Sequence, residues 1–436
     1  MLQPSCIAAT SEIPRGLMPK TSKVRVMCYE FDLERDVLGK GAYGEVYKAT
    51  LVSLPGNNVN RIGGTQGNLV ALKRTLCSHK EEGIPASTIR EIMVLNEIAK
   101  STRDVVGTGS PELFGSENVV KLYDVFFEKN VFYMALEFCE AGDLSCYLKT
   151  LPLHHLTDDR QYRQWVWDLL SGLYFLHRKE FSHRDLKPQN LVLKAVPSGT
   201  PFSKVNLVGE TKSEPRATTQ YVLKITDFGL SRIEGIPVKK YQHESVTLWY
   251  RSPDVLLGNT NYNYSVDLWS AGCIIAELAS GNVLFRGRNN LEQLKCIFTR
   301  LGQPTESNFP SMEQYALYEK FFNGVDGIHL FQKGKDDGGT RVYSDSFENA
   351  KQRLHCYFTR YGSIGMVGNN GVDLVARLLA YEPSKRITAE EALQHPFFCL
   401  FSRAVSLPRR QNDSPMMATT AADGAKEATG PPLKKK

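Results

Sequence analysis

The sequence predicts an α+β protein of two lobes, the first rich in strands and the second mostly helical. The chain has 436 residues, which is long enough for two lobes that each bury a core. Between Tyr29 and Leu136, apolar residues alternate with polar ones or form short runs bounded by turns, as in strands. From Asp143 onward the apolar residues recur at helical spacing instead.

Composition narrows the possible functions. Hydrophobic residues make up 42% of the chain and charged residues 23%, as in ordinary globular proteins. No apolar run reaches the ~18 residues that a membrane span needs, and the longest candidate contains Glu277. A net charge of +6 without one long block of basic residues gives no reason to expect a nucleic-acid partner. We therefore expect neither a membrane nor a nucleic acid as partner.

The cysteines and the start of the chain bear on the compartment. The nine cysteines are scattered without a CxxC pair, which argues against a disulfide framework or a zinc site and favours a reducing compartment. Residues 1–28 show no clear periodicity, so we expect a flexible leader, and they lack the pattern of a secretory signal. The expected location is the cytoplasm, the nucleus or both.

A glycine motif follows the first strand pattern. The sequence fits GxGxxG, and the candidate nucleotide-binding residues are Leu38, Gly39, Lys40, Gly41, Ala42, Tyr43, Gly44, Glu45 and Val46. A dinucleotide-binding turn would need a helix after Gly44 and an acid about 20 residues later. The residues after Gly44 alternate like a strand instead, and residues 59–65 contain no acid. This favours a glycine-rich hairpin, whose backbone amides can approach triphosphate oxygens without Cβ clashes.

A lysine and a glutamate come next. The apolar run from Leu69 predicts a buried strand that ends at Lys73, a candidate ligand for phosphate groups downstream of such a hairpin. Glu91, on a predicted helix, is the carboxylate that can orient this lysine. Ile89 stands two positions earlier and so points roughly 200° away around the helix. The residues alone do not decide whether Ile89 is covered by other parts of this chain or by a second protein.

The remainder of the first lobe contains strands, insertions and a connector. Strands are predicted at residues 119–123 and 131–136, and polar insertions at 51–68 and 101–117. The backbone of the connector around Glu137 and Cys139 is a candidate contact for an adenine edge. In the second lobe, residues 161–177 predict a helix whose stripe of large apolar residues belongs to the core; the stripe consists of Trp165, Leu169, Leu173 and Leu176.

Residues 183–190 carry a carboxylate, an ammonium group and an amide that suit phosphoryl transfer. Asp185 can orient and deprotonate an acceptor hydroxyl, Lys187 can neutralise the migrating phosphoryl group, and Asn190 can hold a divalent ion through its amide oxygen. Asp227, between a strand and a glycine turn, is a second candidate magnesium ligand, although in isolation an Asx-turn would explain it. The order of these motifs along the chain favours the catalytic interpretation.

With these motifs, residues 31–398 resemble a eukaryotic protein kinase. Residues 85–91 are similar to the PSTAIRE helix of the cyclin-dependent kinases, and residues 246–251 to the substrate-side segment of that family. The match continues at residues 267–273, 284–287, 381–386 and 395–398.

The resemblance implies a bilobal protein kinase fold over residues 29–398, with lobes at 30–138 and 139–400, and ATP and Mg²⁺ as cofactors. It also implies a cyclin partner that buries Ile89 and pushes Glu91 towards Lys73. The implied reaction is phosphorylation of Ser or Thr before Pro in protein substrates. Such a preference has a physical basis, because a pocket that leaves an N–H unpaired penalises residues other than proline.

The resemblance further implies that Asp267 braces the catalytic loop and that Arg386 pairs with Asp254. Asp254 is one methylene shorter than the glutamate usual in the family. Residues 194–221 and 321–370 are insertions without an assigned role, and residues 402–436 have the composition of a disordered tail.

Two departures from the family concern regulation. Gln242 stands where the family usually carries a phosphorylated Thr, and a phosphate would bring about −1.5 to −2 charge that glutamine lacks. The arginines that resemble the phosphate-binding trio, Arg90, Arg184 and Arg232, then lack their usual anion. We therefore expect activity that requires a cyclin but no phosphorylation of this segment. Ala42 replaces an inhibitory Thr, and Tyr43 remains open as either an inhibitory phosphosite or an ordinary aromatic residue of the loop.

A non-catalytic relative that only binds partners is the alternative function. Its mark would be the loss of Lys73, Asp185 or Asp227, and all three residues are present. The sequence therefore favours an active enzyme.

Overall fold

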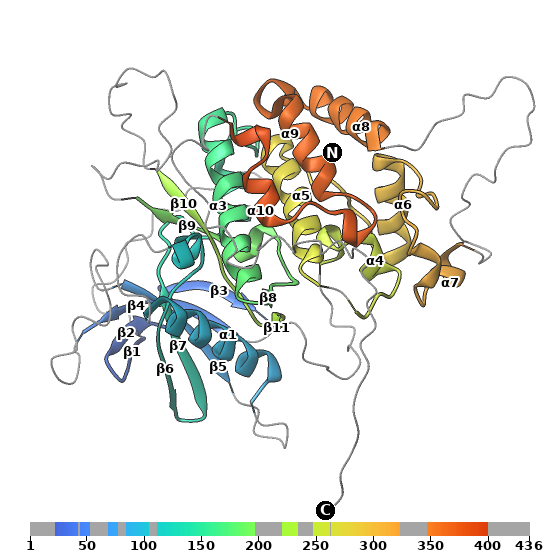
Figure 1. Ribbon diagram of the computed structural model, residues 1–436. Helices are drawn as coiled ribbons and strands as arrows, with labels where there is room; N and C mark the ends of the chain where they lie inside the picture. The colour runs from blue at the N-terminus through green and yellow to red at the C-terminus, as the bar shows by residue number, and fades with distance from the viewer. Residues whose placement is uncertain are drawn as a thin grey trace, which may run out of the picture.

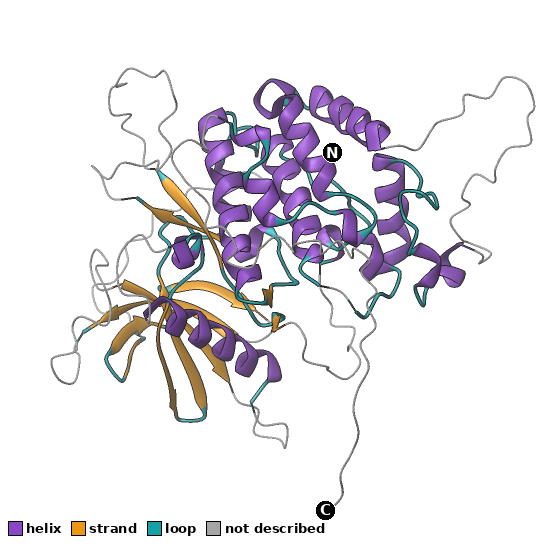
Figure 2. Cartoon of the chain, viewed as in Figure 1, coloured by secondary structure: helices purple, strands orange, loops and turns teal. Residues whose placement is uncertain are grey.

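The computed structural model has two lobes that differ in secondary structure (Figures 1 and 2), and it confirms the predicted α+β class. Strands β1 to β7 and helix α1 form the N-terminal lobe, and the other helices form most of the larger C-terminal lobe. The structure describes residues 22–41, 44–52, 69–76, 84–103, 111–196, 220–233, 247–261, 263–322 and 347–399.

A seven-stranded antiparallel sheet forms the N-terminal lobe, in the order β1-β2-β4-β5-β7-β6 with β3 paired to β4. Its strands are β1 Lys23–Val26, β2 Tyr29–Asp32, β3 Val37–Gly41, β4 Gly44–Leu51, β5 Leu69–Leu76, β6 Leu122–Glu128 and β7 Val131–Glu137. Helix α1, Ala86–Arg103, packs against β6. The sheet thereby places the glycine hairpin, Lys73 and the connector after β7 on adjacent strands.

The C-terminal lobe is built around two buried helices, α3 and α5. Its helices are α2 Leu144–Thr150, α3 Asp159–Arg178, α4 Pro253–Leu256, α5 Ser265–Ser280, α6 Asn290–Leu301, α7 Tyr318–Phe322, α8 Phe347–Arg360, α9 Ile364–Leu378 and α10 Ala389–Leu393. The predicted core stripe of α3 is confirmed, because its four residues are fully buried. Among the described residues, no helix is long and apolar enough to cross a membrane.

Two short antiparallel sheets carry the catalytic segments. In the first, β8 Phe181–Ser182 pairs with β11 Arg232–Ile233. In the second, β9 Leu191–Ala195 pairs with β10 Tyr221–Ile225. The loop of residues 183–190 therefore lies between two strand pairs, and Asp227 stands two residues after the end of β10.

Several expectations about local structure were wrong. Residues 23–26 form β1 instead of continuing the flexible leader, because they pair with β2 and bury Val26. Two strand bounds also differ: the strand expected at residues 119–123 begins only at Leu122, and the strand expected to end at Lys73 continues to Leu76.

Another error concerns residues 101–117. This segment is not wholly a polar insertion, because α1 runs to Arg103, and Phe114 packs edge-on against Trp167 and Tyr174 of α3. The C-terminal part of the segment at 321–370 is also ordered, as α8 and the start of α9, with Leu354 and Phe358 fully buried. Ala42, Tyr43, Gln242 and the tail at 402–436 lie outside the described residues.

Candidate active site

The three predicted residues of the catalytic loop lie in mutual contact. The Lys187 ammonium group is 2.7 Å from Asp185 Oδ2. The amide nitrogen of Asn190 donates to the carbonyl oxygen of Asp185 at 2.7 Å and to its Oδ2 atom at 3.1 Å. With nitrogen used in this way, the amide oxygen of Asn190 is the atom that could bind a metal ion.

Asp267, on α5, holds the backbone of this loop. Its Oδ2 and Oδ1 atoms accept the N–H groups of His183 at 2.8 Å and Arg184 at 2.7 Å. Arg184 has a φ of 73°, a region that costs a non-glycine residue on the order of 1–3 kcal/mol. The expected bracing role of Asp267 is confirmed in geometry, and it explains how the loop keeps this conformation.

His183 joins the catalytic loop to the segment before Asp227. Its Nε2 atom lies 2.9 Å from the Thr226 carbonyl oxygen, and its Nδ1 atom accepts the Asp185 N–H at 3.3 Å. These partners assign a neutral ring protonated on Nε2. The Thr226 N–H also donates to the Asn190 carbonyl oxygen at 3.0 Å. Asp227 is therefore fixed beside Asn190 through its neighbour.

Lys73 connects the N-terminal lobe to Asp227. Its Nζ atom lies 2.8 and 2.7 Å from the carboxylate oxygens of Glu91 and 3.4 Å from Asp227 Oδ1. Burial alone would lower the Lys73 pKa, but the two carboxylates outweigh it and raise the pKa above its ordinary value. The lysine is therefore held charged, as a ligand for phosphate groups requires.

Asp227 has the charge and exposure of a metal ligand. Burial alone would raise its pKa, but the charges of Lys73 and Lys187 outweigh this and lower it. Its side chain is 45% exposed, compared with 16% for Lys73. Among the described residues, no three acidic, histidine or cysteine side chains gather around a common point. One carboxylate and one amide oxygen suit Mg²⁺, which usually completes its shell with water and substrate phosphates.

The glycine motif forms the expected hairpin. Strands β3 and β4 pair from Gly39 with Val46 to Gly41 with Gly44, so a strand follows Gly44 and the dinucleotide-binding turn is excluded. A Cβ on Gly44 would lie 2.1 Å from the Arg74 carbonyl oxygen, whereas one on Gly39 would meet nothing within 4 Å. Gly44 thus serves packing within the sheet, and Gly39 leaves space beside the hairpin.

Around the connector after β7, the structure limits the adenine contact proposed from sequence. The Glu137 N–H donates to the Lys121 carbonyl oxygen at 2.9 Å, so it is not a donor for a ligand. Any adenine edge would therefore contact the Glu137 carbonyl or the Cys139 backbone. The Cys139 thiol is buried, which raises its pKa to about 12 and makes it a poor nucleophile.

Sequence reasoning missed Lys224. This lysine on β10 is 6% exposed, and its Nζ atom lies 3.1 Å from Glu137 Oε2, whose side chain is 8% exposed. It also donates to the Glu117 carbonyl oxygen. Lys224 therefore links the end of β7 to the strand that leads into Asp227. Its place in an apolar run before Asp227 was the available signal, because a lysine there needs a buried partner.

A second missed group, Asp168 on α3, holds the same strand. Asp168 Oδ2 accepts the Leu223 N–H at 3.0 Å, and its Oδ1 accepts from Gln164 at 2.8 Å. The amide of Asn118 donates to the Leu223 carbonyl oxygen at 3.0 Å. Burial raises the Asp168 pKa to about 7. Buried polar side chains thus bind both the N–H group and the carbonyl oxygen of Leu223 and hold strand β10 in place.

Helix α1 presents opposite faces to the site and to solvent. Glu91 is 3% exposed, whereas Ile89 is 43% and Met93 59% exposed. Phe127, on the strand that α1 packs against, is 54% exposed. The other described parts of this chain therefore do not cover Ile89, which excludes them as the explanation for an apolar residue at this position.

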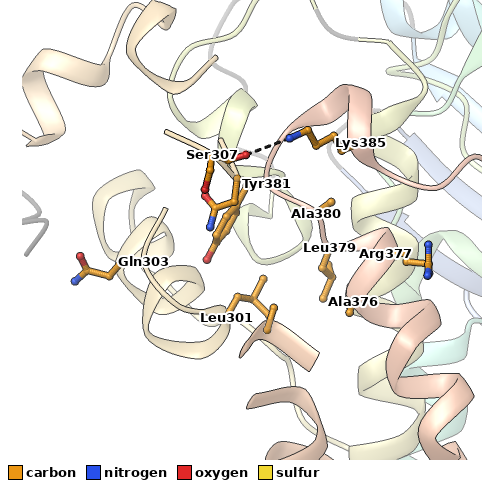
Figure 3. Close-up of a pocket in the computed structure, with 11 residues that line it drawn as sticks. Leu301, Gln303, Ser307, Ala376, Arg377, Leu379, Ala380, Tyr381 and Lys385 are labelled. Carbon is orange, nitrogen blue, oxygen red and sulfur yellow. Dashed lines mark hydrogen bonds between the residues drawn. The ribbon is translucent and has the colours of Figure 1, made fainter. Parts of the chain in front are cut away.

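A cavity of about 420 Å³ lies elsewhere, between the end of α6 and the segment after α9 (Figure 3). Its lining includes Leu301, Tyr381 and Lys385, and Lys385 donates to the Ser307 carbonyl oxygen at 3.1 Å. As far as the described residues define it, the lining contains none of the predicted catalytic or nucleotide-binding residues. This cavity is therefore separate from the candidate active site.

Comparisons with known proteins identify relatives of this chain. The family model of the protein kinase domain matches residues 33–398. The chain is similar to "Cell division control protein 2 homolog 1" of Trypanosoma brucei brucei, with 35% identity over 364 residues, 83% of this chain and 95% of the relative. Its structure is similar to a chain in the CAK complex of Chaetomium thermophilum bound to ATP-gamma-S. That match has a TM-score of 0.57 and 25% identity, and it covers 85% of this chain and 91% of the other.

Proposed function

The chain belongs to the protein kinase family, within its cyclin-dependent branch, and on this premise we propose that it phosphorylates Ser or Thr before Pro in proteins when a cyclin-type subunit is bound. The observation that carries the proposal is the convergence of Asp185, Asn190 and Asp227 beside Lys73. These residues stem from both lobes, and their side chains match the charges that develop in phosphoryl transfer.

Asp185 is the proposed base of the reaction. Its carboxylate accepts the proton of the substrate hydroxyl as the hydroxyl oxygen forms a bond to the γ-phosphorus of ATP and the bond to the β,γ-bridging oxygen breaks, which releases ADP. Lys187, 2.7 Å from Asp185, can follow the phosphoryl group with its ammonium charge. Both groups are fixed before substrate binds, because Asn190 and Asp267 hold the loop, and such positioning lowers the barrier.

Lys73 and the metal ligands hold the nucleotide in this proposal. Lys73, oriented by Glu91, binds phosphate oxygens, and the glycine hairpin from Leu38 to Val46 covers them. Asn190 and Asp227 would hold Mg²⁺. When bound, the ion supplies positive charge to the phosphate oxygens. Asp227 remains ionised well below neutral pH because its pKa is lowered.

The outward face of α1 and β6 is the proposed docking surface for the cyclin-type subunit. Ile89, Met93 and Phe127 present large apolar side chains there. The comparison with a chain from the CAK complex supports a regulatory subunit, because that relative is part of an assembly. A partner on this surface would contact the residue two positions before Glu91 and so secure the Lys73–Glu91 pair.

Phosphate transfer from radiolabelled ATP tests the proposal directly. Matched Ser-Pro and Ser-Ala peptides are compared with and without candidate cyclins, and we expect transfer only to Ser-Pro with a cyclin present. Asp185→Asn is the control, and it should lower kcat about 10²–10⁴-fold while ATP binding is retained. Equal labelling of both peptides would refute the proline preference. Failure of every cyclin to stimulate transfer would contradict the assigned type of partner.

A further inference from the structure

A hydrogen bond, a close approach and a shared lysine join the first turns of α1 to the turn that carries Asp227. The Arg90 guanidinium group donates to the Gly229 carbonyl oxygen at 2.6 Å. Ser87 Cβ lies 3.7 Å from the position that a Cβ on Gly229 would take. Glu91 reaches Asp227 through Lys73. The metal-binding turn is therefore packed against and hydrogen-bonded to the helix that presents Ile89 outward.

The turn needs external support to keep its conformation. Asp227 has a φ of 65°, a left-handed backbone conformation that is strained for a residue with a side chain. On one side, Thr226 is held by His183 and Asn190. On the other side, Arg90 holds the carbonyl two residues after Asp227. A charged donor on a neutral carbonyl forms one of the stronger hydrogen bonds found in proteins, so this contact can stabilise the strained turn.

We propose that Arg90 is a positioning residue that fixes Asp227 for metal binding and, through the Gly229 carbonyl, couples α1 to that residue without an activation-segment phosphate. The proposal rests on the proposed function. Arg90 makes its contact with a backbone carbonyl, and Gln242 offers no negative charge in the segment where a phosphate would stand. A partner that secures α1 through Ile89 and Met93 would thereby secure Arg90, which lies between them in sequence on the same helix.

The experiment measures binding of ATP-γ-S to the full-length chain by calorimetry, in Mg²⁺ and in EDTA. Arg90→Gln should weaken binding in Mg²⁺ at least fivefold and leave binding in EDTA within twofold, because only the metal-dependent part passes through Asp227. Arg90→Lys keeps one donor and should retain part of the Mg²⁺-dependent gain. Lys100→Gln, on the exposed surface of the same helix, is the matched control and should behave like the wild type.

Several outcomes would overturn the proposal. If Arg90→Gln kept the full Mg²⁺-dependent gain, Arg90 would not position Asp227. Equal weakening in Mg²⁺ and EDTA would show a general structural role instead. If phosphatase treatment of the wild type removed the Mg²⁺-dependent gain, a phosphate would be required. Failure of the untreated wild type to bind ATP-γ-S at all would contradict the proposed function itself, and so is distinguished from failure of the Arg90 role.

Discussion

Arg386 and Asp254 form a fully buried ion pair, with 2.6 Å between Nη2 and Oδ1 and no exposed surface on either side chain. The guanidinium group also donates to the carbonyl oxygens of Ser265, Ala380 and Tyr381. The pairing expected from sequence is thus confirmed, and the shorter side chain of Asp254 still reaches. The pair ties α4 to the start of α5 and to the segment after α9.

Replacement of Arg386 should destabilise the C-terminal lobe more than a substitution at the surface does. Arg386→Met leaves Asp254 buried without its partner, so we expect the free energy of unfolding to fall by about 3–5 kcal/mol. Urea denaturation measures this change. The control is Lys23→Met, which breaks an exposed pair with Glu30 and should cost about 1 kcal/mol or less. Similar losses in the free energy of unfolding for both variants would show that the buried pair stabilises the fold no more than the exposed pair does.

The Lys224–Glu137 pair should behave as a coupled unit. Lys224→Met leaves a buried carboxylate unpaired and should lower the free energy of unfolding by about 3–5 kcal/mol. Adding Glu137→Gln removes the orphaned charge, so the double variant should be more stable than Lys224→Met alone. A double-mutant cycle by urea denaturation provides the measurement. Simple additivity of the two single effects would show that the pair does not interact.

The raised pKa of Asp168 predicts how the stability of the protein depends on pH. Its folded pKa of about 7 lies above the value of about 3.9 expected for unfolded Asp. Between these two pKa values, the folded state holds a proton that the unfolded state has lost. The contribution of Asp168 to the free energy of unfolding is therefore full below about pH 4 and is lost as the pH rises through about 7. Glu117 contributes to the raised pKa. We expect the stability of Asp168→Asn relative to the wild type to rise between pH 5 and 8, by on the order of a few kcal/mol.

Chemical denaturation across that pH range checks the Asp168 prediction. Asp159→Asn is the matched control, because Asp159 lies on the same helix with its side chain 55% exposed. The control should show the same pH dependence as the wild type. A constant difference between Asp168→Asn and the wild type at every pH would mean that Asp168 does not titrate in this range.

Ile89 should contribute to partner affinity without contributing to the isolated fold. Its side chain is 43% exposed in the free chain, and burying an apolar side chain of this size is worth about 1.5–3 kcal/mol. Ile89→Ala should therefore raise the cyclin concentration for half-maximal activation about tenfold and leave the melting temperature nearly unchanged. Lys100→Ala, also on α1, serves as the control. Activation of Ile89→Ala at wild-type cyclin concentrations would place the partner elsewhere.

The sequence by itself determined the fold class, the order of the site motifs and the helix face that carries Ile89. These follow from local rules: strand and helix periodicity, the need for glycine where backbone approaches a ligand, and the few side chains that can bind phosphate or magnesium. The positions of Lys73, Asp185 and Asp227 could be predicted because each follows a local signature. Residues 101–117 could not be predicted in this way, since their polar composition concealed the packing of Phe114 against Trp167 and Tyr174.

Only the tertiary structure decided how the buried polar groups pair. Lys224 meets Glu137, Asp168 meets the backbone of Leu223, and Arg90 meets the Gly229 carbonyl oxygen, each between segments far apart in the chain. A buried charge or N–H group must find a partner, but its sequence neighbours do not specify which one. The partner is set by which segments the packed core brings together, and in this protein those segments surround the strand and turn that carry Asp227.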